Sequence, residues 1–179
     1  VAPALCAMLS NPSCSLTSLD ISYNKFDDED WVKIADVLAS STSLTFVDIR
    51  QKVSVSQGVL SNLGEELLKP SSGSKIDSLR CNHFDIVRGQ HQLKLSGIFL
   101  DPSTACLLAG VLRRNTELIE VDLSATSIDD AGIDHLIVAL EMNSSLRLID
   151  VQHNRLAMST LAKLHEVGAG KSPPCEVSS

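Results

Sequence analysis

Carboxylates recur at one position of the sequence when its internal repeats are aligned. This position holds Asp20, Asp48, Lys94, Asp122 and Asp150. Four carboxylates in register predict an acidic stripe, which is suited to docking a basic segment of another protein. The alternative is that each aspartate is solvated, or bonded to neighbouring strand residues, and binds nothing. The lysine interrupts the stripe in either case.

Five further side chains are expected on the same face as this column. Phe46 and Leu148 are apolar residues that could anchor a partner, or are scattered surface apolars. Arg50 and Arg80, together with the lysine of the column, could neutralise part of the acidic stripe. Glu120 adds one more carboxylate. These residues and the column form the predicted partner-binding set.

Other reactive side chains favour structural roles. The acidic run at 27–30 could suggest a metal site, but it lacks the glycine and distal glutamate of a calcium loop and is typical of a helix start. Cys81, His83 and His91 could be imagined as a metal or nucleophile group, but Cys81 occupies a position that otherwise carries buried leucine. The nine glycines are scattered, and no nucleophile or phosphate-loop pattern occurs. We expect no catalytic residue, no metal site and no cofactor or small-molecule site.

Composition narrows the class of protein. Apolar residues make up 44% of the 179 residues, which is enough for one domain with a sizeable core. A net charge of −7 disfavours nucleic acid and anionic membranes as partners. No apolar run approaches the roughly 18 residues that span a bilayer. The five cysteines are isolated and odd in number, which favours a reducing, cytoplasmic location.

The elements that must position these side chains are repeated units. The stretch Leu118–Asn143 reads as a short strand, a turn and an amphipathic helix, and a shift of 28 positions superimposes it on its neighbours. The first complete unit has its apolar and turn residues at Leu16, Leu19, Ile21, Asn24 and Phe26. Alternation in the strand and a spacing of three to four in the helix predict one buried side for each.

This spacing resembles the leucine-rich repeat, and the 28-residue length resembles its ribonuclease-inhibitor-like type. The resemblance covers about residues 4–167. It implies an α/β solenoid shaped as a horseshoe arc, with parallel strands on the concave face and helices on the convex face. The predicted parts are a truncated repeat with a helix remnant (1–15), two repeats (16–75), an irregular half-repeat without a helix (76–89), three repeats (90–167) and a disordered tail (168–179). The incomplete first unit predicts that the chain is a piece of a longer one.

The resemblance also implies a function class. Proteins of this kind hold another protein on the concave face and the repeat-edge loops, so we expect a non-catalytic interaction module or scaffold, for instance in a cytoskeletal assembly. Two alternatives share the repeat type: a GTPase-activating protein of the Ran type and the sensor region of an NLR-like receptor. A purely architectural spacer is a third.

Overall fold

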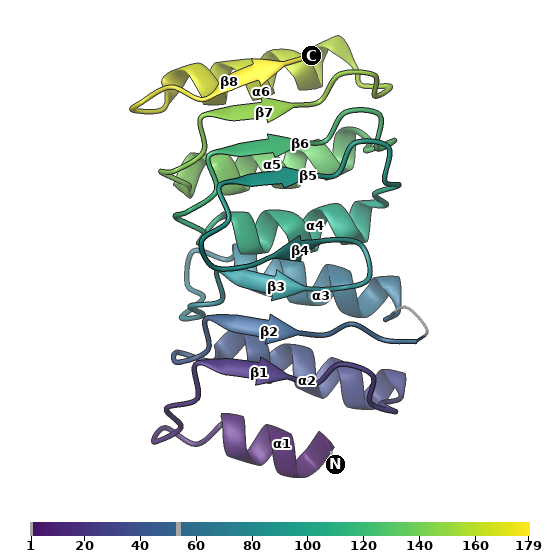
Figure 1. The fold of residues 1–179 in the computed structure, drawn as a ribbon, viewed down its shortest axis with the longest axis vertical. Coiled ribbons are helices and arrows are strands. Elements are labelled where there is room, and N and C mark those ends of the chain that lie inside the picture. Colours follow the sequence, from purple (N-terminus) through teal and green to yellow (C-terminus); the bar gives the residue numbers. More distant parts are fainter. Residues whose placement is uncertain (1, 53–54) are drawn as a thin grey trace.

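The computed structural model describes residues 2–52 and 55–179, and it stacks short strands along one side of the molecule and helices along the other (Figure 1). The helices are α1 (Ala2–Leu9), α2 (Asp28–Ser40), α3 (Gln57–Leu68), α4 (Pro102–Leu112), α5 (Asp130–Met142) and α6 (Met158–Gly170). The strands are β1 (Ser18–Asp20), β2 (Phe46–Asp48), β3 (Ser78–Arg80), β4 (Asp85–Ile86), β5 (Gln92–Lys94), β6 (Glu120–Asp122), β7 (Leu148–Asp150) and β8 (Glu176–Ser178). The chain ends lie at opposite ends of the stack.

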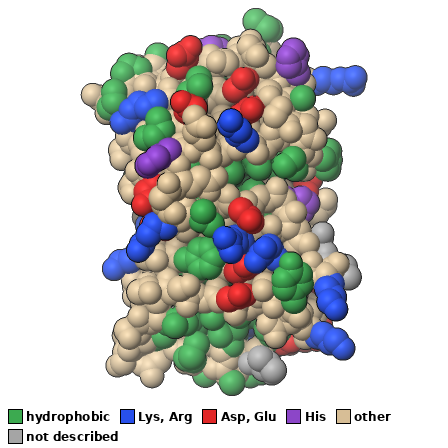
Figure 2. All heavy atoms as spheres, in the orientation of Figure 1, with side chains coloured by type: hydrophobic (Ala, Val, Ile, Leu, Met, Phe, Trp, Pro, Cys, Tyr) green, Lys and Arg blue, Asp and Glu red, His purple; other side chains and the backbone are tan. Residues whose placement is uncertain are grey.

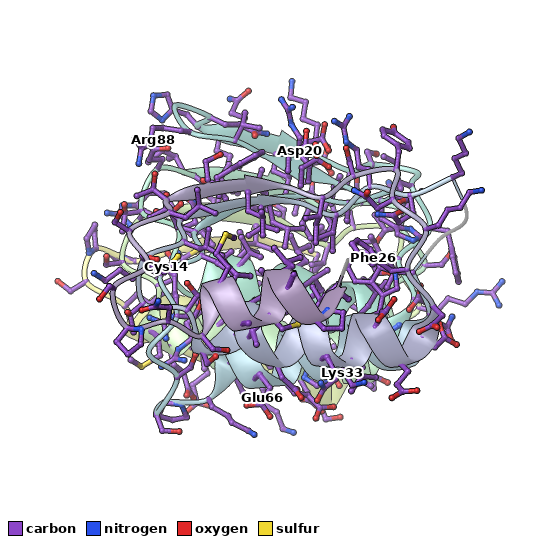
Figure 3. The ribbon with its side chains drawn as sticks, turned by 90° about the horizontal axis from the view of Figure 1, so that it is seen from below. Cys14, Asp20, Phe26, Lys33, Glu66 and Arg88 are labelled. Atoms are coloured by element: carbon purple, nitrogen blue, oxygen red, sulfur yellow. The ribbon has the colours of Figure 1, made fainter. Side chains whose placement is uncertain are left out.

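The strands pair in the 28-residue register that the sequence predicts. Leu19 lies beside Val47, and Val121 lies beside Ile149, each in a parallel pair. The central residue of each strand points into the core, and its two neighbours point out of the sheet. A view along the stack shows the two layers, with Asp20 on the outer side of the strands and Lys33 on the outer side of the helices (Figure 3). The predicted α/β arrangement is therefore confirmed.

The strand layer is divided into two sheets, in the orders β1-β2-β3-β4 and β5-β6-β7-β8. Residues 76–89 contribute β3 and then β4, which turns back antiparallel to β3. Leu79 pairs with Ile86, and both are fully buried. The strand layer thus differs from the predicted all-parallel row at β4, because a hairpin replaces the usual strand–helix unit.

The helix layer closes over this irregular segment through two glycines. Helices α3 and α4 pack directly against each other at Gly64 and Gly110. A Cβ on Gly64 would lie 2.5 Å from the carbonyl carbon of Cys106, and one on Gly110 would lie 2.8 Å from the Cβ of Leu67. Strands β3 and β4 are therefore added to the strand layer without a helix of their own in the helix layer.

The predicted disorder of residues 168–179 is wrong. Helix α6 continues to Gly170, and β8 pairs in parallel with β7, with Val177 beside Ile149. The N–H of Cys175 donates to the carbonyl of Gly168 at 2.9 Å, and Cys175 is buried. The tail is small and polar in composition, yet Val177 lies 28 residues after Ile149 and continues the register.

Acidic residues begin three of the helices. Asp27 accepts a hydrogen bond from the N–H of Asp30 at 2.8 Å, Asp101 accepts from Ser103 and Thr104, and Asp129 accepts from Gly132. The predicted helix start at 27–30 is confirmed, because carboxylates satisfy free N–H groups at helix N-termini. Within residues 2–52 and 55–179 no group of three or more potential ligands could hold a metal ion. None of the described helices is long and apolar enough to cross a bilayer.

A polar ladder joins the C-terminal ends of the helices. The buried amide of Asn143 donates to the carbonyls of Leu112 and Asn115, at 2.6 and 2.8 Å, and its oxygen accepts from the N–H groups of Ser145 and Leu146. In the next unit Lys171 reaches the carbonyls of Leu140 and Asn143 in the same way. This ladder fixes neighbouring units to each other at their junctions.

Candidate functional site

The aspartates of the predicted column end their own strands. In each case the carboxylate accepts a hydrogen bond from the backbone N–H two residues later. The pairs are Asp20–Ser22 (2.9 Å), Asp48–Arg50 (3.1 Å), Asp122–Ser124 (2.9 Å) and Asp150–Gln152 (2.9 Å). Bonding to Ser22 also holds the pKa of Asp20 below its usual value. The sequence allows two alternatives for these aspartates, partner docking and bonding to neighbouring residues. These hydrogen bonds correspond to the second alternative.

Asp48 is withdrawn from solvent by an arginine of its own unit. Only 2% of its surface is exposed, and Arg50 binds it through Nε and Nη2 at distances of 2.6–3.1 Å. This two-pronged contact raises the pKa of Arg50 above its usual value. The same guanidinium lies 5.9 Å from the ring centre of Tyr23. Asp48 therefore offers no free charge to a basic partner.

Arg80 is held less completely. Its guanidinium lies 5.8 Å from the ring centre of Phe46, and its Nε is 3.9 Å from the carboxylate of Asp85, which is beyond hydrogen-bond distance. Within the described part of the chain this buried Nε finds no hydrogen-bond partner. Arg80 thus has donors to offer, whereas the donors of Arg50 are largely occupied.

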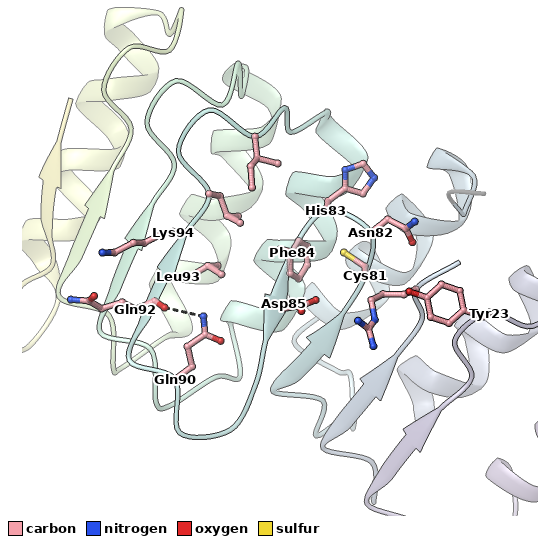
Figure 4. Close-up of a pocket in the computed structure, with 13 residues that line it drawn as sticks. Tyr23, Cys81, Asn82, His83, Phe84, Asp85, Gln90, Gln92, Leu93 and Lys94 are labelled. Atoms are coloured by element: carbon pink, nitrogen blue, oxygen red, sulfur yellow. Dashed lines mark hydrogen bonds between the residues drawn. The ribbon is translucent and has the colours of Figure 1, made fainter. Parts of the chain in front are cut away.

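A hollow of about 730 Å³ opens between the β3–β4 hairpin and β5, and we call it the sheet-gap hollow. Phe84 and Asp85 of the hairpin lie on one side of it and β5 lies on the other, with the side chains of Gln92 and Lys94 directed away from the hairpin (Figure 4). Arg50, Tyr23 and Ile98 also line it. The hollow lies where the two sheets separate, so the irregular segment creates it.

Large apolar side chains border this hollow. Tyr23 and Ile98 line it with 57% and 41% of their surface exposed, and Phe99, the next residue in the chain, is 64% exposed. The chain has only six aromatic residues, so two exposed ones near a single hollow call for an explanation. Midway along this face, basic and hydrophobic side chains lie next to one another (Figure 2).

The structure divides the predicted binding residues between the two sheets. Arg50 and Lys94 line the hollow from opposite sides, while Arg80 and Phe46 adjoin it through Asp85. Asp20 and Asp48 follow on the first sheet, and the second sheet carries Glu120, Asp122, Leu148 and Asp150. Glu120 accepts from the amide of Gln92 at 2.7 Å. The column is therefore not one continuous acidic surface.

Sequence reasoning missed Tyr23, Ile98, Phe99, Phe84 and Asp85. Ile98 follows the buried leucine of β5 in the chain, yet its own side chain is exposed. Tyr23 adopts a left-handed backbone conformation, with φ of 56°, in the turn that follows β1. The sequence held one signal for Tyr23: it is an aromatic residue outside the leucine pattern, in a chain with few aromatic residues.

The cysteine and histidine group does not provide a nucleophile. Burial raises the pKa of Cys81 to about 11, which keeps its thiol protonated at neutral pH. His91 uses Nδ1 on the carbonyl of Glu117 at 3.1 Å. The side chains around the open hollow offer cationic, carboxylate and aromatic contacts.

Comparisons with known proteins agree with this architecture. A family model described as "Leucine Rich repeat" matches residues 13–35. The chain is 30% identical to NACHT, LRR and PYD domains-containing protein 5 of Bos taurus over 92% of its length, and 30% identical to Capping protein, Arp2/3 and myosin-I linker protein 3 of Homo sapiens over 83%. It spans only 16% and 10% of those two proteins.

A solved structure shares the fold. The C-terminal domain of tropomodulin from Caenorhabditis elegans superimposes with a TM-score of 0.51, at 16% sequence identity, over 93% of this chain and 90% of that domain. The 28-residue strand register, the helix layer and the matching family model lead to one conclusion. The chain is a leucine-rich repeat protein.

Proposed function

We propose that this chain is a non-catalytic protein-interaction module whose partner binds the strand side, centred on the sheet-gap hollow. The observation that carries the proposal is the exposure of Tyr23 and Ile98 in the lining of the hollow, beside the cations Arg50 and Lys94. Aromatic and arginine side chains around a concavity are typical of protein-binding hot spots. The two-layer stack supplies a rigid surface, which lowers the ordering cost of binding.

The relatives support an interaction role. The human relative is named for linking capping protein, Arp2/3 and myosin-I, so its name describes a protein that holds other proteins. The cysteines of this chain are all free thiols in the structure, which supports the proposed reducing, intracellular location. The 28-residue register with a full helix in most units supports the ribonuclease-inhibitor-like subtype and its curved arc.

The predicted binding residues have separate roles in this proposal. Phe46, Arg50, Arg80 and Lys94 lie at or next to the hollow and form its contact group. The aspartates of the column shape the strand ends. Asp122 and Asp150 are only partly exposed on the second sheet, where a basic segment of the partner would meet them.

Site-specific photo-crosslinking in the native cells tests the proposal. A photoreactive phenylalanine analogue placed at Tyr23 should give covalent adducts with another protein. The matched control is the same analogue at Val138, which is 43% exposed on α5 of the helix layer and should give none. Adducts from the control position alone, or from neither position, would refute binding on the strand side.

A further inference from the structure

Strand β4 presents unpaired backbone groups to the sheet-gap hollow. The N–H of Ile49 donates to the carbonyl of Arg80, so the backbone groups of Arg80 point toward β2. Arg80 is directly opposite Asp85 in the antiparallel pair. In an antiparallel pair, two opposite residues either hydrogen-bond each other through their backbone groups or both point those groups away from the partner strand. The N–H and C=O of Asp85 therefore point away from β3, toward β5.

Strand β5 presents a second unpaired edge. The N–H of Leu95 donates to Asp122, and the carbonyl of His91 accepts from Ile119, so the odd-numbered residues pair with β6. Successive residues of a strand alternate, and hence Gln92 and Lys94 turn their backbone groups toward β4. The side chain of Gln90 reaches the carbonyl of Gln92 at 2.8 Å, but no described strand pairs with this edge.

The two edges belong to different sheets and lie on opposite sides of the sheet-gap hollow. The space between β4 and β5 is visibly wider than that between the paired strands on either side (Figure 1), and it is the place where the hollow opens. A strand running in the direction of the parallel array would be antiparallel to β4 and parallel to β5. Both pairings are regular, so one inserted strand could satisfy both edges.

The surroundings define the side chains that such a strand would carry. Leu93, Leu95 and Phe84 are buried residues that line the hollow, which favours small apolar residues on the inner side of the inserted strand. On the outer side β4 contributes the carboxylate of Asp85, and two cations flank it: Lys94 of β5, which is exposed, and Arg80 of β3, whose Nε lacks a hydrogen-bond partner among the described residues. These cations favour acidic residues there.

We propose that the gap between β4 and β5 binds an extended segment of a partner protein, with alternating small apolar and acidic residues, as an additional strand that joins the two sheets. This inference rests on the proposed interaction function and names the partner segment. Binding by strand addition derives its affinity from backbone hydrogen bonds and its selectivity from alternate side chains.

A synthetic peptide tests the proposal directly. The probe is a fluorescently labelled ten-residue peptide of alternating valine and glutamate, titrated with the purified chain and followed by anisotropy. We expect saturable binding. A peptide of alternating valine and lysine should bind at least about tenfold more weakly, and so should the valine–glutamate peptide with alternate backbone nitrogens methylated, since each change removes about 1.4 kcal/mol or more.

Variants of Lys94 separate backbone from charge. Lys94→Ala removes the charge and keeps the N–H, whereas Lys94→Pro also removes the N–H that faces the gap and leaves the bonds to β6 intact. We expect the proline variant to bind more weakly than the alanine variant, and Lys163→Ala on α6 to bind like the parent chain. Thermal melting checks folding, and the methylated peptide provides the same test if the proline variant unfolds.

Three results would overturn the strand-addition proposal. They are equal binding of the methylated and unmethylated peptides, equal binding by the proline and alanine variants, and a homodimer that Lys94→Pro dissociates, which would assign the gap to a second copy. If crosslinks from Tyr23 persist while the peptide fails, only this inference falls. If those crosslinks are absent, the proposed function falls as well.

Discussion

The contact between α3 and α4 predicts a large cost for a single methyl group. In Gly64→Ala the added Cβ would lie 2.5 Å from the carbonyl carbon of Cys106 and 2.6 Å from the nitrogen of Leu107. Carbon atoms prefer separations of about 3.5–4.0 Å, so one helix must move by roughly 1 Å. Neither obstacle is a flexible side chain, because both belong to the backbone of α4.

The net effect combines overpacking with helix propensity. Overpacking of a tight interior costs about 1–3 kcal/mol, and replacing a helical glycine by alanine returns roughly 0.5–1 kcal/mol. We expect Gly64→Ala to lower the free energy of unfolding by about 1–2 kcal/mol. In a chain of this size that corresponds to a fall in Tm of roughly 2–8 °C.

The same helix offers the matched control. Gly58 lies in the first turn of α3, and a Cβ there would meet nothing within 4 Å. Gly58→Ala should therefore leave stability unchanged or raise it by up to about 1 kcal/mol. Urea unfolding followed by circular dichroism measures both variants. If Gly64→Ala proves as stable as Gly58→Ala, the close approach of α3 and α4 is wrong, and so is our account of the extra strands.

Three further predictions concern stability. Leu136→Ala should cost about 2–5 kcal/mol in urea unfolding, because Leu136 is buried, while Val138→Ala on the exposed side of α5 should cost under about 0.5 kcal/mol; equal losses would mean that the helix register is wrong. Burial raises the pKa of Cys81 to about 11 and that of Cys106 to about 12, whereas a thiol in the unfolded chain has a pKa near 8.5. Unfolding therefore releases protons at any pH between the unfolded and the folded pKa. In that range the free energy of unfolding should fall by about 1.4 kcal/mol per pH unit for each thiol. Alanine at both positions should flatten that decline in melts at pH 8–10, and an unchanged slope would contradict it. Asn143→Asp removes the amide donor from the carbonyls of Leu112 and Asn115, of which Asn115 keeps the hydroxyl of Ser145, and should cost about 1–3 kcal/mol at pH 7; the new carboxyl gains a raised folded pKa, so stability should recover as pH falls toward 4, and a loss independent of pH would count against the ladder.

Much of the architecture could be predicted from periodicity. Leucine-type residues 28 positions apart indicated parallel strands in register, and Leu19 beside Val47 confirms this spacing. The same 28-residue register also predicts the last strand, although the composition of the C-terminal segment does not indicate one. Val177 follows Ile149 by 28 residues, whereas the small, polar composition of the tail predicts disorder. Packing against β7 and burial of Cys175 outweigh the weak local preference of this segment.

The candidate site was less predictable, because its geometry depends on contacts between distant units. The sequence placed Arg50, Arg80 and Lys94 on the strand side, but it could not show that Arg50 neutralises Asp48 while Arg80 keeps an unbonded Nε. The hollow itself depends on how far β4 and β5 separate. Helices α3 and α4 meet at Gly64, 28 residues before β5 begins, and no local pattern reports this contact.

The irregular segment gives the array a surface that a regular array lacks. In a uniform stack each internal strand pairs on both sides, and free edges occur only at the two ends. Here the hairpin adds β3 and β4 to the strand layer, while Gly64 and Gly110 keep α3 and α4 in contact behind them. The strand layer must therefore extend further than the helix layer at this point, and it separates between β4 and β5. The separation leaves two facing strand edges within the array, recessed in a hollow and flanked by charged side chains. A single strand of a partner can enter this hollow, whereas the edge of a second sheet is too broad to pair there.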